Sequence, residues 1–259
     1  MRIATYNVNG ITARLPRVLE WLEAVKPDVV CLQEIKIETD RFPRAAIEAA
    51  GYHALVHGQK GFHGVAILSR EPAEERCRAL PADPELDWDD VQSRYIEADV
   101  GGVIVGGLYL PNGNPQPGPK FDYKLRWMER LRAHARALLE TERPVVLAGD
   151  YNVCPTDEDV FSMRRMADDA LVQPESRRAF RALLADGWTD AIRARHPAGP
   201  VYTFWDYQAG AWQHDHGLRI DHLLLSPAAA DRLIDAGVDR SARALEKASD
   251  HAPTWVKLQ

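Results

Sequence analysis

The sequence has few cysteines and no long apolar run. The 259 residues include three cysteines, Cys31, Cys77 and Cys154, an odd number without a C-x-x-C pair, which is typical of free thiols in a reducing compartment. No apolar stretch approaches the roughly 20 residues that cross a bilayer. The opening MRIATYNVNG has no basic segment followed by an apolar one. We therefore predict a soluble cytoplasmic protein that makes no membrane contact.

An excess of positive charge is also missing. Lys and Arg number 32 against 38 Asp and Glu, and the formal net charge is −6. Proteins that bind polyanions usually carry basic surfaces, so this total weakly disfavours a nucleic-acid partner. It does not exclude one, because carboxylates gathered around a metal lower the total even where basic residues cluster nearby.

The chain has no Pro/Ser-rich linker, no low-complexity segment and no short repeat, and its predicted strands and helices alternate. This pattern favours one layered α/β domain over residues 1–259. The apolar patterns predict strands within 2–10, 28–34, 52–57, 64–70, 143–152, 201–208, 218–226 and 248–258, a hairpin within 93–109, and helices within 14–27, 41–51, 119–142, 175–187, 188–197 and 226–237.

Short polar residues recur where the predicted strands end. Loops at strand ends converge over a rigid sheet, so such residues are candidates for one shared site. Carboxylate and amide oxygens are hard ligands that suit Mg²⁺ or Mn²⁺. The recurring residues are Asn7, Asn9, Glu34, Tyr109, Asn112, Asp150, Asn152, Asp221, Asp250 and His251.

Two spacings among these residues predict particular geometries. Asp150 and Asn152 are two residues apart, so on an extended backbone they share a face and can address one phosphate and its attacking water. Asp250 and His251 are adjacent and point apart, so His251 needs an orienting carboxylate from elsewhere. We predict Asp221 as that partner.

Seven motifs appear in a fixed order: TYNVNG, LQEIK, GVAILS, YLPNG, GDYNVCPTDEDV, RIDHLLLS and SDHAP. This series resembles the exonuclease III group of the endonuclease/exonuclease/phosphatase superfamily, over essentially the whole chain. The resemblance implies a four-layered α/β sandwich, with two mixed β-sheets packed face to face and helices outside. It also implies a magnesium-dependent DNA repair phosphodiesterase that hydrolyses the phosphodiester 5′ to abasic sites in duplex DNA and has 3′-to-5′ exonuclease and 3′-end-cleaning activity.

The resemblance implies a role for each strand-end residue. In the family pattern one residue orients or deprotonates the attacking water, a histidine stabilises the phosphate charge, and a tyrosine lies near the scissile phosphate. The implied catalytic set is Tyr109, Asp150, Asn152, Asp221 and His251, and the implied metal ligands are Asn7, Glu34 and Asp250, with Mg²⁺ or alternatively Mn²⁺.

The resemblance further implies a small apolar pocket that accepts an abasic sugar and excludes an intact nucleotide. Its predicted lining is Phe204, Trp205, Leu218 and Ile220, with Ile220 equally well explained as a core residue; Asn9, Lys36 and Asn112 complete the predicted substrate contacts. Leu218 and Asn9 depart from some relatives, which carry an aromatic residue and Asp there. Lys124 and Arg126 are predicted to be solvated helix residues.

Two alternatives remain open from the sequence. One is a same-fold nuclease or phosphatase that acts on another phosphate ester. The other is a catalytically silent nucleic-acid-binding relative, although such a protein is expected to have lost Glu34, Asp150, Asp221 or His251, and all four are present. The expected partner is duplex DNA with abasic sites or 3′ ends, and the expected state is a monomer.

Overall fold

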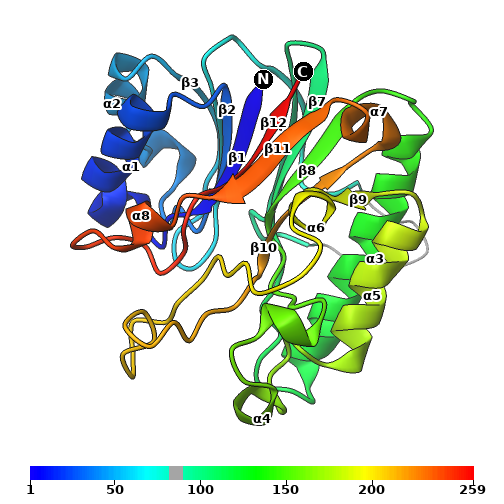
Figure 1. The fold of residues 1–259 in the computed structure, drawn as a ribbon. Helices are drawn as coiled ribbons and strands as arrows, with labels where there is room; N and C mark the ends of the chain where they lie inside the picture. The colour runs from blue at the N-terminus through cyan, green and yellow to red at the C-terminus, as the bar shows by residue number, and fades with distance from the viewer. Residues whose placement is uncertain (82–89) are drawn as a thin grey trace.

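The computed structural model describes residues 1–81 and 90–259. Its centre is a pair of six-stranded sheets (Figure 1). The first sheet runs in the order β11 (Leu233–Val238), β12 (Thr254–Leu258), β1 (Arg2–Asn7), β2 (Val29–Gln33), β4 (Val65–Ser69) and β3 (His53–His57). It is mixed, because β1 and β2 are parallel while their other neighbours are antiparallel.

The second sheet contains the middle of the chain. Its order is β5 (Glu74–Arg78), β6 (Tyr95–Val100), β7 (Val103–Tyr109), β8 (Val145–Asp150), β10 (Asp221–Leu225) and β9 (Thr189–Asp190). The pair β7–β8 is parallel, since the long helix α3 (Pro119–Leu139) connects the two strands.

Helices cover both outer faces. On the first sheet lie α1 (Ile11–Val25), α2 (Arg44–Ala49) and α8 (Arg240–Arg243), and on the second lie α3 and α5 (Pro174–Ala185), as Figure 1 shows. The remaining short elements are α4 (Met163–Met166), α6 (Ala191–Arg195), α7 (Pro227–Ala230) and the 3₁₀ turns Thr39–Arg41 and Asp157–Asp159. Among the helices of the described ranges, none has both the length and the hydropathy that a bilayer span requires.

Three apolar layers hold the four structural layers together. Ile67, Val105 and Ala148 belong to the cluster between the two sheets, and all three are fully buried. A second cluster fills the space between the first sheet and α1, and a third fills the space between the second sheet and α3 and α5. Strands such as β2 and β8 are buried along their whole length, which explains their continuous apolar sequence. The predicted four-layered sandwich is therefore confirmed.

Two predicted elements differ from the structure, and one strand of the structure was not predicted. Residues 201–208 form no strand; Phe204 makes only isolated bridges to Leu218 and His251, because this segment crosses the strand ends instead of extending a sheet. The helix predicted over 226–237 ends at Ala230, and the chain continues into the edge strand β11. The strand β5 was not predicted, since its sequence EERCR is mostly exposed and lacks an apolar face.

The strand registers place the polar residues at the strand ends of both sheets along the same edge of the sandwich. Asp150 lies opposite Tyr109 on one neighbour and opposite Asp221 on the other. In the first sheet Asn7 pairs with Gln33, which places Glu34 beside it. The ends of five strands from both sheets thus meet at one edge of the sandwich.

Candidate active site

A cavity of about 500 Å³ opens at this edge of the sandwich. Its polar side is formed by the strand-end residues and its other side by apolar side chains from the loops that follow β8 and precede β10. Of the predicted site residues, those that line it are Glu34, Tyr109, Asn112, Asp150, Asn152, Phe204, Leu218, Ile220, Asp250 and His251.

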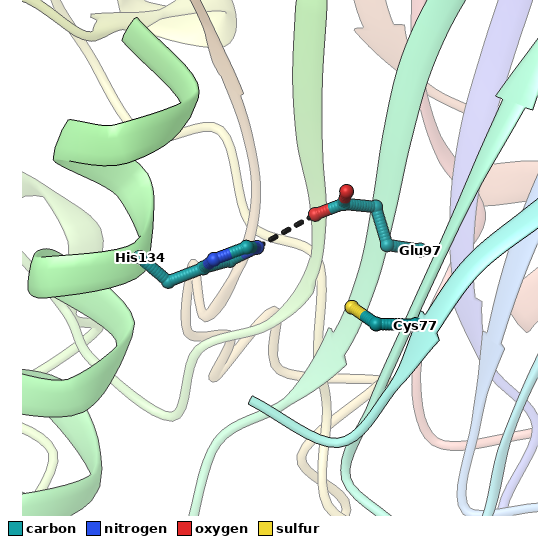
Figure 2. Close-up of side chains that lie close together, drawn as sticks. All are labelled: Cys77, Glu97 and His134. Atoms are coloured by element: carbon teal, nitrogen blue, oxygen red, sulfur yellow. Dashed lines mark hydrogen bonds and ion pairs between the residues drawn. The ribbon is translucent and has the colours of Figure 1, made fainter. Parts of the chain in front are cut away.

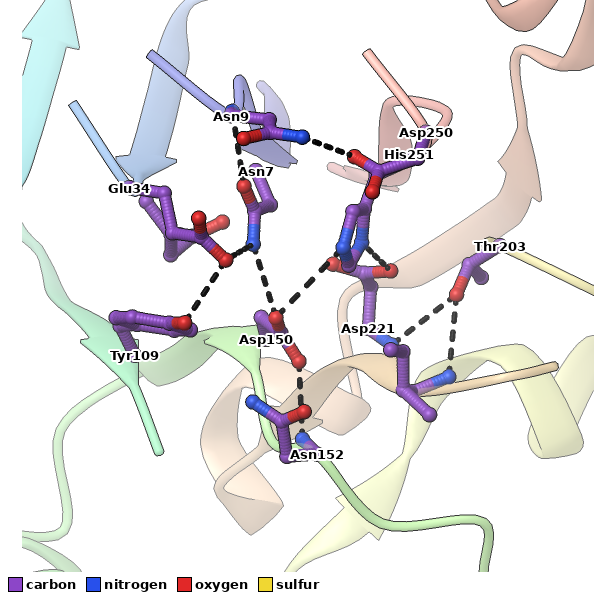
Figure 3. Close-up of polar contacts among 12 residues, drawn as sticks. Asn7, Asn9, Glu34, Tyr109, Asp150, Asn152, Thr203, Asp221, Asp250 and His251 are labelled. Atoms are coloured by element: carbon purple, nitrogen blue, oxygen red, sulfur yellow. Dashed lines mark hydrogen bonds and ion pairs between the residues drawn. The ribbon is translucent and has the colours of Figure 1, made fainter. Parts of the chain in front are cut away.

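Glu34 occupies one end of the polar side (Figure 3). Its Oε1 accepts hydrogen bonds from Asn7 Nδ2 at 3.0 Å and from the Tyr109 hydroxyl at 2.8 Å, and its Oε2 pairs with Lys36 Nζ at 2.8 Å. Burial raises the pKa of Glu34, but these three donors outweigh it and lower the pKa below its ordinary value. Glu34 is therefore ionised at neutral pH, and Tyr109, whose pKa burial and Glu34 raise far above normal, keeps its proton.

Asp150 lies at the centre of the polar network. Its Oδ2 accepts a hydrogen bond from Asn7 Nδ2 at 3.0 Å, and its Oδ1 accepts one from the backbone N–H of Asn152 at 2.9 Å. Burial raises the pKa of Asp150, while the nearby His251 opposes that rise. A carboxylate whose pKa is raised toward neutrality is suited to accept a proton during catalysis.

His251 and Asp221 form a buried pair. His251 Nδ1 lies 2.8 Å from Asp221 Oδ2, and its Nε2 lies 3.8 Å from Asp150 Oδ2. Burial alone lowers the pKa of His251, but Asp221 and then Asp150 raise it to about 10. The imidazole is therefore a cation whose Nδ1–H donates to Asp221 and whose Nε2–H faces Asp150. The hydrogen bond predicted between His251 and Asp221 is present in the structure.

The backbone of this site adopts conformations that are unusual outside glycine. Asn9, Glu34, Lys36 and Asn152 all have positive φ, from 46° to 55°. Asparagine tolerates this region, but the long side chains of Glu34 and Lys36 do so at a cost. These strained residues flank the cavity, which supports a functional interpretation of the backbone geometry.

The site carries more negative than positive charge. Four carboxylates, those of Glu34, Asp150, Asp221 and Asp250, face two cations, Lys36 and His251, which leaves two negative charges when all are ionised. Asp250 joins this group through Asn9, whose Nδ2 donates to it at 3.1 Å. A divalent cation offsets that excess, and the oxygen-rich donor set suits a hard metal ion.

Two places could hold such an ion. Ligand atoms of Asp150, Asp221 and His251 lie within 4.8 Å of one another, and Asp221 Oδ1 is buried without a hydrogen-bond partner among the described residues. To ligate a metal there, the His251 cation must first lose its Nε2 proton. The second place adjoins Glu34. There Asn7 presents its amide nitrogen to both Glu34 and Asp150, while its Oδ1 accepts the N–H of Asn9. To ligate a metal beside Glu34, the Asn7 amide must turn over.

The apolar wall contains three of the four residues predicted for it. Phe204, Leu218 and Ile220 line the cavity, and the Phe204 ring packs edge-on against His251 with centroids 4.9 Å apart. The prediction for Trp205 is wrong. Its side chain is fully buried on the other side of the segment, where Nε1 donates to Asp215 at 2.8 Å and the ring meets Trp212.

The sequence did not reveal the rest of the wall. Several residues from 161–171 and the loop before β10 complete it: Phe161, Arg165, Met166, Asp169, Leu171 and His216. The rings of Phe161 and His216 stack with centroids 4.7 Å apart. The sequence signal that could have identified these wall residues was the presence of apolar side chains in a segment that we had predicted only as a connecting loop.

Thr203 is another residue that the sequence analysis missed. Its hydroxyl accepts the backbone N–H groups of Ile220 and Asp221, each at 3.1 Å (Figure 3).

A second group of potential ligands lies under α3, away from the cavity. Figure 2 shows Cys77 and Glu97 on neighbouring strands and His134 on the helix. Glu97 already accepts hydrogen bonds from Arg76 at 2.7 Å, Tyr95 at 2.6 Å and His134 at 2.7 Å. Burial first, and then Glu97, raise the pKa of Cys77 to about 12, so its thiol stays protonated. We interpret this group as a satisfied hydrogen-bond network that links β6 to α3.

Comparison with known proteins defines the class. The sequence model of the Endonuclease/Exonuclease/phosphatase family matches residues 4–251, and the chain belongs to this family. Among its relatives, exodeoxyribonuclease III of Haemophilus influenzae is 33% identical, with 100% of each chain covered.

Two solved structures are similar in both fold and sequence. An AP endonuclease from Archaeoglobus fulgidus is 36% identical with a TM-score of 0.94, over 100% of this chain and 99% of that one. A 3′ phosphatase from Neisseria, bound to a product DNA hairpin, is 40% identical with a TM-score of 0.95 over the same shares. These matches confirm the resemblance to the exonuclease III group and place the chain among hydrolases of that type.

Proposed function

We propose that this protein is a magnesium-dependent DNA repair phosphodiesterase that hydrolyses the bond 5′ to abasic sites in duplex DNA. The observation that carries the proposal is the row Glu34–Asn7–Asp150–His251–Asp221, joined by contacts of 2.8–3.8 Å and bordered by the apolar wall of the cavity. A phosphate held over the row has the apolar side chains of Phe204, Leu218 and Ile220 beside it.

The residues of the row have separate roles in this proposal. Asp150 accepts a proton from the attacking water, since its carboxylate has a raised pKa and lies at the centre of the site. The His251 cation donates through Nε2–H to a non-bridging phosphate oxygen as negative charge grows there. Asp221 holds the imidazolium in place. Asn152 and Tyr109 bind phosphate oxygens or the leaving oxygen.

Asn7, Glu34 and Asp250 are the proposed metal ligands. A bound Mg²⁺ supplies charge neutralisation at the phosphate and the leaving oxygen. Lys36, paired with Glu34 and donating to Asn9 at 2.6 Å, lies where it can contact a neighbouring phosphate. Asn9 and Asn112 are proposed substrate contacts, with Asn112 exposed at the rim of the cavity.

The apolar wall is proposed to select the abasic sugar. Phe204, Leu218 and Ile220 offer it dispersion contacts and no hydrogen-bond partner for a base edge. A flipped nucleotide that keeps its base is larger and carries polar groups, so burying it here costs free energy.

A second candidate activity is removal of nucleotides or phosphate from 3′ ends. It is favoured by the similar proteins named as an exodeoxyribonuclease and as a 3′ phosphatase bound to DNA. Both candidate activities use the same row of residues, and they differ in what fills the apolar cavity. We further propose that residues 1–259 form one domain that acts as a cytoplasmic monomer.

One assay separates these activities. End-labelled duplexes carrying a tetrahydrofuran residue, a 3′ phosphate or no damage are incubated side by side with Mg²⁺, with Mn²⁺ and with EDTA. We expect incision 5′ to the tetrahydrofuran residue that EDTA abolishes and that Asp150→Asn reduces by about 10²-fold or more. DNA binding without turnover on any substrate supports a catalytically silent relative instead and contradicts the proposal.

A further inference from the structure

Lys124 is a buried cation that lies outside the row of catalytic residues. It belongs to α3, and its side chain is fully buried rather than solvated, so the prediction from the sequence is wrong for this residue. Arg126, two residues further on, is exposed as predicted. Burial lowers the pKa of Lys124 to about 7. A helix residue that only promotes solubility does not carry such a cost.

The Lys124 ammonium joins three separate loops. Its Nζ donates to the backbone oxygens of Asn152 at 2.6 Å, Asn112 at 3.1 Å and Ala170 at 3.3 Å. Asn112 follows β7, Asn152 follows β8, and Ala170 lies between Asp169 and Leu171 on the cavity wall. The three N–H groups of the Lys124 ammonium thus each donate a hydrogen bond to a backbone carbonyl, and each carbonyl belongs to a different segment on this side of the cavity.

The side chain of Asn152 is fixed by the same group of loops. Its Oδ1 accepts a hydrogen bond from Asn112 Nδ2 at 3.0 Å, and its Nδ2 donates to the Leu110 oxygen at 2.8 Å. With the backbone oxygen of Asn152 bound to Lys124, both the φ of 48° and the direction of the amide are held.

The neighbouring Gly113 is shaped to admit the lysine. An added Cβ at Gly113 meets Lys124 Cδ at 2.7 Å and Ala170 Cβ at 3.2 Å, and its φ is 92°. Two features therefore favour glycine at this position of the YLPNG motif. One is its positive φ, and the other is the absence of a Cβ, which leaves space for the aliphatic part of the Lys124 side chain.

We propose that Lys124 is a positioning residue for hydrolysis, which sets the place of Asn152 and Asn112 over the substrate phosphate by joining their loops to the cavity wall. This inference rests on the proposed function of the same site. Because Lys124 acts through the loops and does not touch the substrate, it is expected to affect turnover more than substrate binding.

The test compares Lys124→Met with a matched control, Arg130→Met. Both residues are buried cations on α3 that donate to backbone carbonyls, but Arg130 donates to Leu80 and Pro81, which do not line the cavity. In Lys124→Met the oxygens of Asn112 and Asn152 lose this donor, whereas Ala170 keeps the Ser176 hydroxyl at 2.7 Å.

On a tetrahydrofuran duplex we expect Lys124→Met to lower kcat by about tenfold or more, because small displacements of aligned groups are costly, while KM changes by less than about threefold. Arg130→Met is expected to lower the unfolding midpoint and to leave kcat within about twofold of the wild type. Equal losses of kcat in the two variants, or a kcat of Lys124→Met close to the wild type, overturn the inference.

A measurement without turnover separates this inference from the proposed function. In Lys124→Met, amide hydrogen exchange is expected to rise in 110–114, 150–154 and 167–171, and in Arg130→Met it is expected to remain at the wild-type rate there. Unchanged exchange in these loops contradicts the inference whether or not the wild type cleaves DNA. A wild type inactive on all three duplexes contradicts only the proposed function.

If Lys124→Met does not fold, Gly113→Ala disturbs the same contact from the loop side. We expect it to lower kcat and to speed exchange in the same three loops, because its Cβ displaces the Lys124 stem. A Gly113→Ala variant with wild-type kcat and wild-type exchange refutes the positioning role.

Discussion

At the scale of single residues, side-chain chemistry predicted which polar residues lie together at the cavity but not how they bond to each other. The need of His251 for a carboxylate predicted Asp221, and the two are 2.8 Å apart. The pairing of Lys36 with Glu34 and the orientation of the Asn7 amide toward two carboxylates were not predictable. Those contacts depend on the relative placement of β1, β2 and β8, which no local pattern encodes.

The His251–Asp221 pair gives a prediction at this scale. In Asp221→Asn the imidazole loses the carboxylate that raises its pKa, so it is less often the cation and less firmly oriented. We expect kcat on a tetrahydrofuran duplex to fall by about 10²-fold or more at neutral pH. Asp157→Asn, at a largely exposed position, is the control and should keep wild-type kcat. An unchanged kcat in Asp221→Asn contradicts the proposed role of Asp221.

At the scale of elements, hydrophobic patterns in the sequence identified the buried strands, but they did not identify the segments that line the cavity. The alternation and apolar content of β1, β2 and β8 predicted them correctly. Residues 201–208 have the aromatic and β-branched composition of a strand, but they cross the strand ends and pair only at isolated positions. The wall formed by 161–171 was missed for a related reason, because its packing partners are distant in the sequence.

The wall leads to a prediction about selectivity. Leu218 lines the cavity between Phe161 and Phe204, and replacing it by Trp fills part of the space proposed for the abasic sugar. We expect Leu218→Trp to slow incision at a tetrahydrofuran residue by about tenfold or more while 3′-phosphate removal changes much less. Leu218→Met, of similar volume, should preserve both activities. Equal slowing of the two reactions in Leu218→Trp excludes the proposed pocket.

The buried ion network beside this wall predicts a dependence of stability on pH. Arg219 Nε donates to Asp159 at 2.7 Å, and Arg219 Nη1 donates to Asp190 at 2.7 Å. Burial raises the pKa of Asp159, but Arg219 and Arg193 outweigh it and hold the pKa far below 3.8. Stability from this lowered pKa is fully present above pH 3.8 and is lost as the pH falls toward the folded-state pKa.

Asp159→Asn tests that network. At neutral pH it leaves buried Arg219 without one of its carboxylates, and we expect a loss of about 3–5 kcal/mol in the free energy of unfolding. The gap between wild type and variant should stay constant from about pH 7 to 5 and narrow below the ordinary pKa of an aspartate. Urea unfolding at a series of pH values measures the gap. A gap that stays constant into the acid range shows that Asp159 does not titrate as proposed.

At the scale of the whole molecule, the motif series predicted the sandwich, whereas the net charge did not indicate the charge distribution of the site. The net charge of −6 says little about a site whose four carboxylates face two cations. The two-sheet architecture was predictable because the family resemblance spans the chain, whereas the position of Lys124 across three loops was not. Its contacts join segments that come together only in the folded molecule.

The residual charge of the site predicts that a divalent cation stabilises the folded protein. We expect Mg²⁺ to raise the thermal unfolding midpoint above that in EDTA and in NaCl of equal ionic strength, because the ion binds the native state alone. Glu34→Gln removes one of the carboxylates and should reduce this increase. An equal midpoint in Mg²⁺ and NaCl argues against metal binding in the absence of DNA.

The first sheet is assembled from both ends of the sequence, with β12 lying between β1 and β11. A growing polypeptide that has been translated only as far as β10 already holds Glu34, Asp150 and Asp221, but it lacks His251 and β12, the antiparallel neighbour of β1. If His251 stabilises the phosphate charge as proposed above, such a partial chain is expected to be inactive on DNA. On that proposal, activity is expected only after β12 has completed the first sheet.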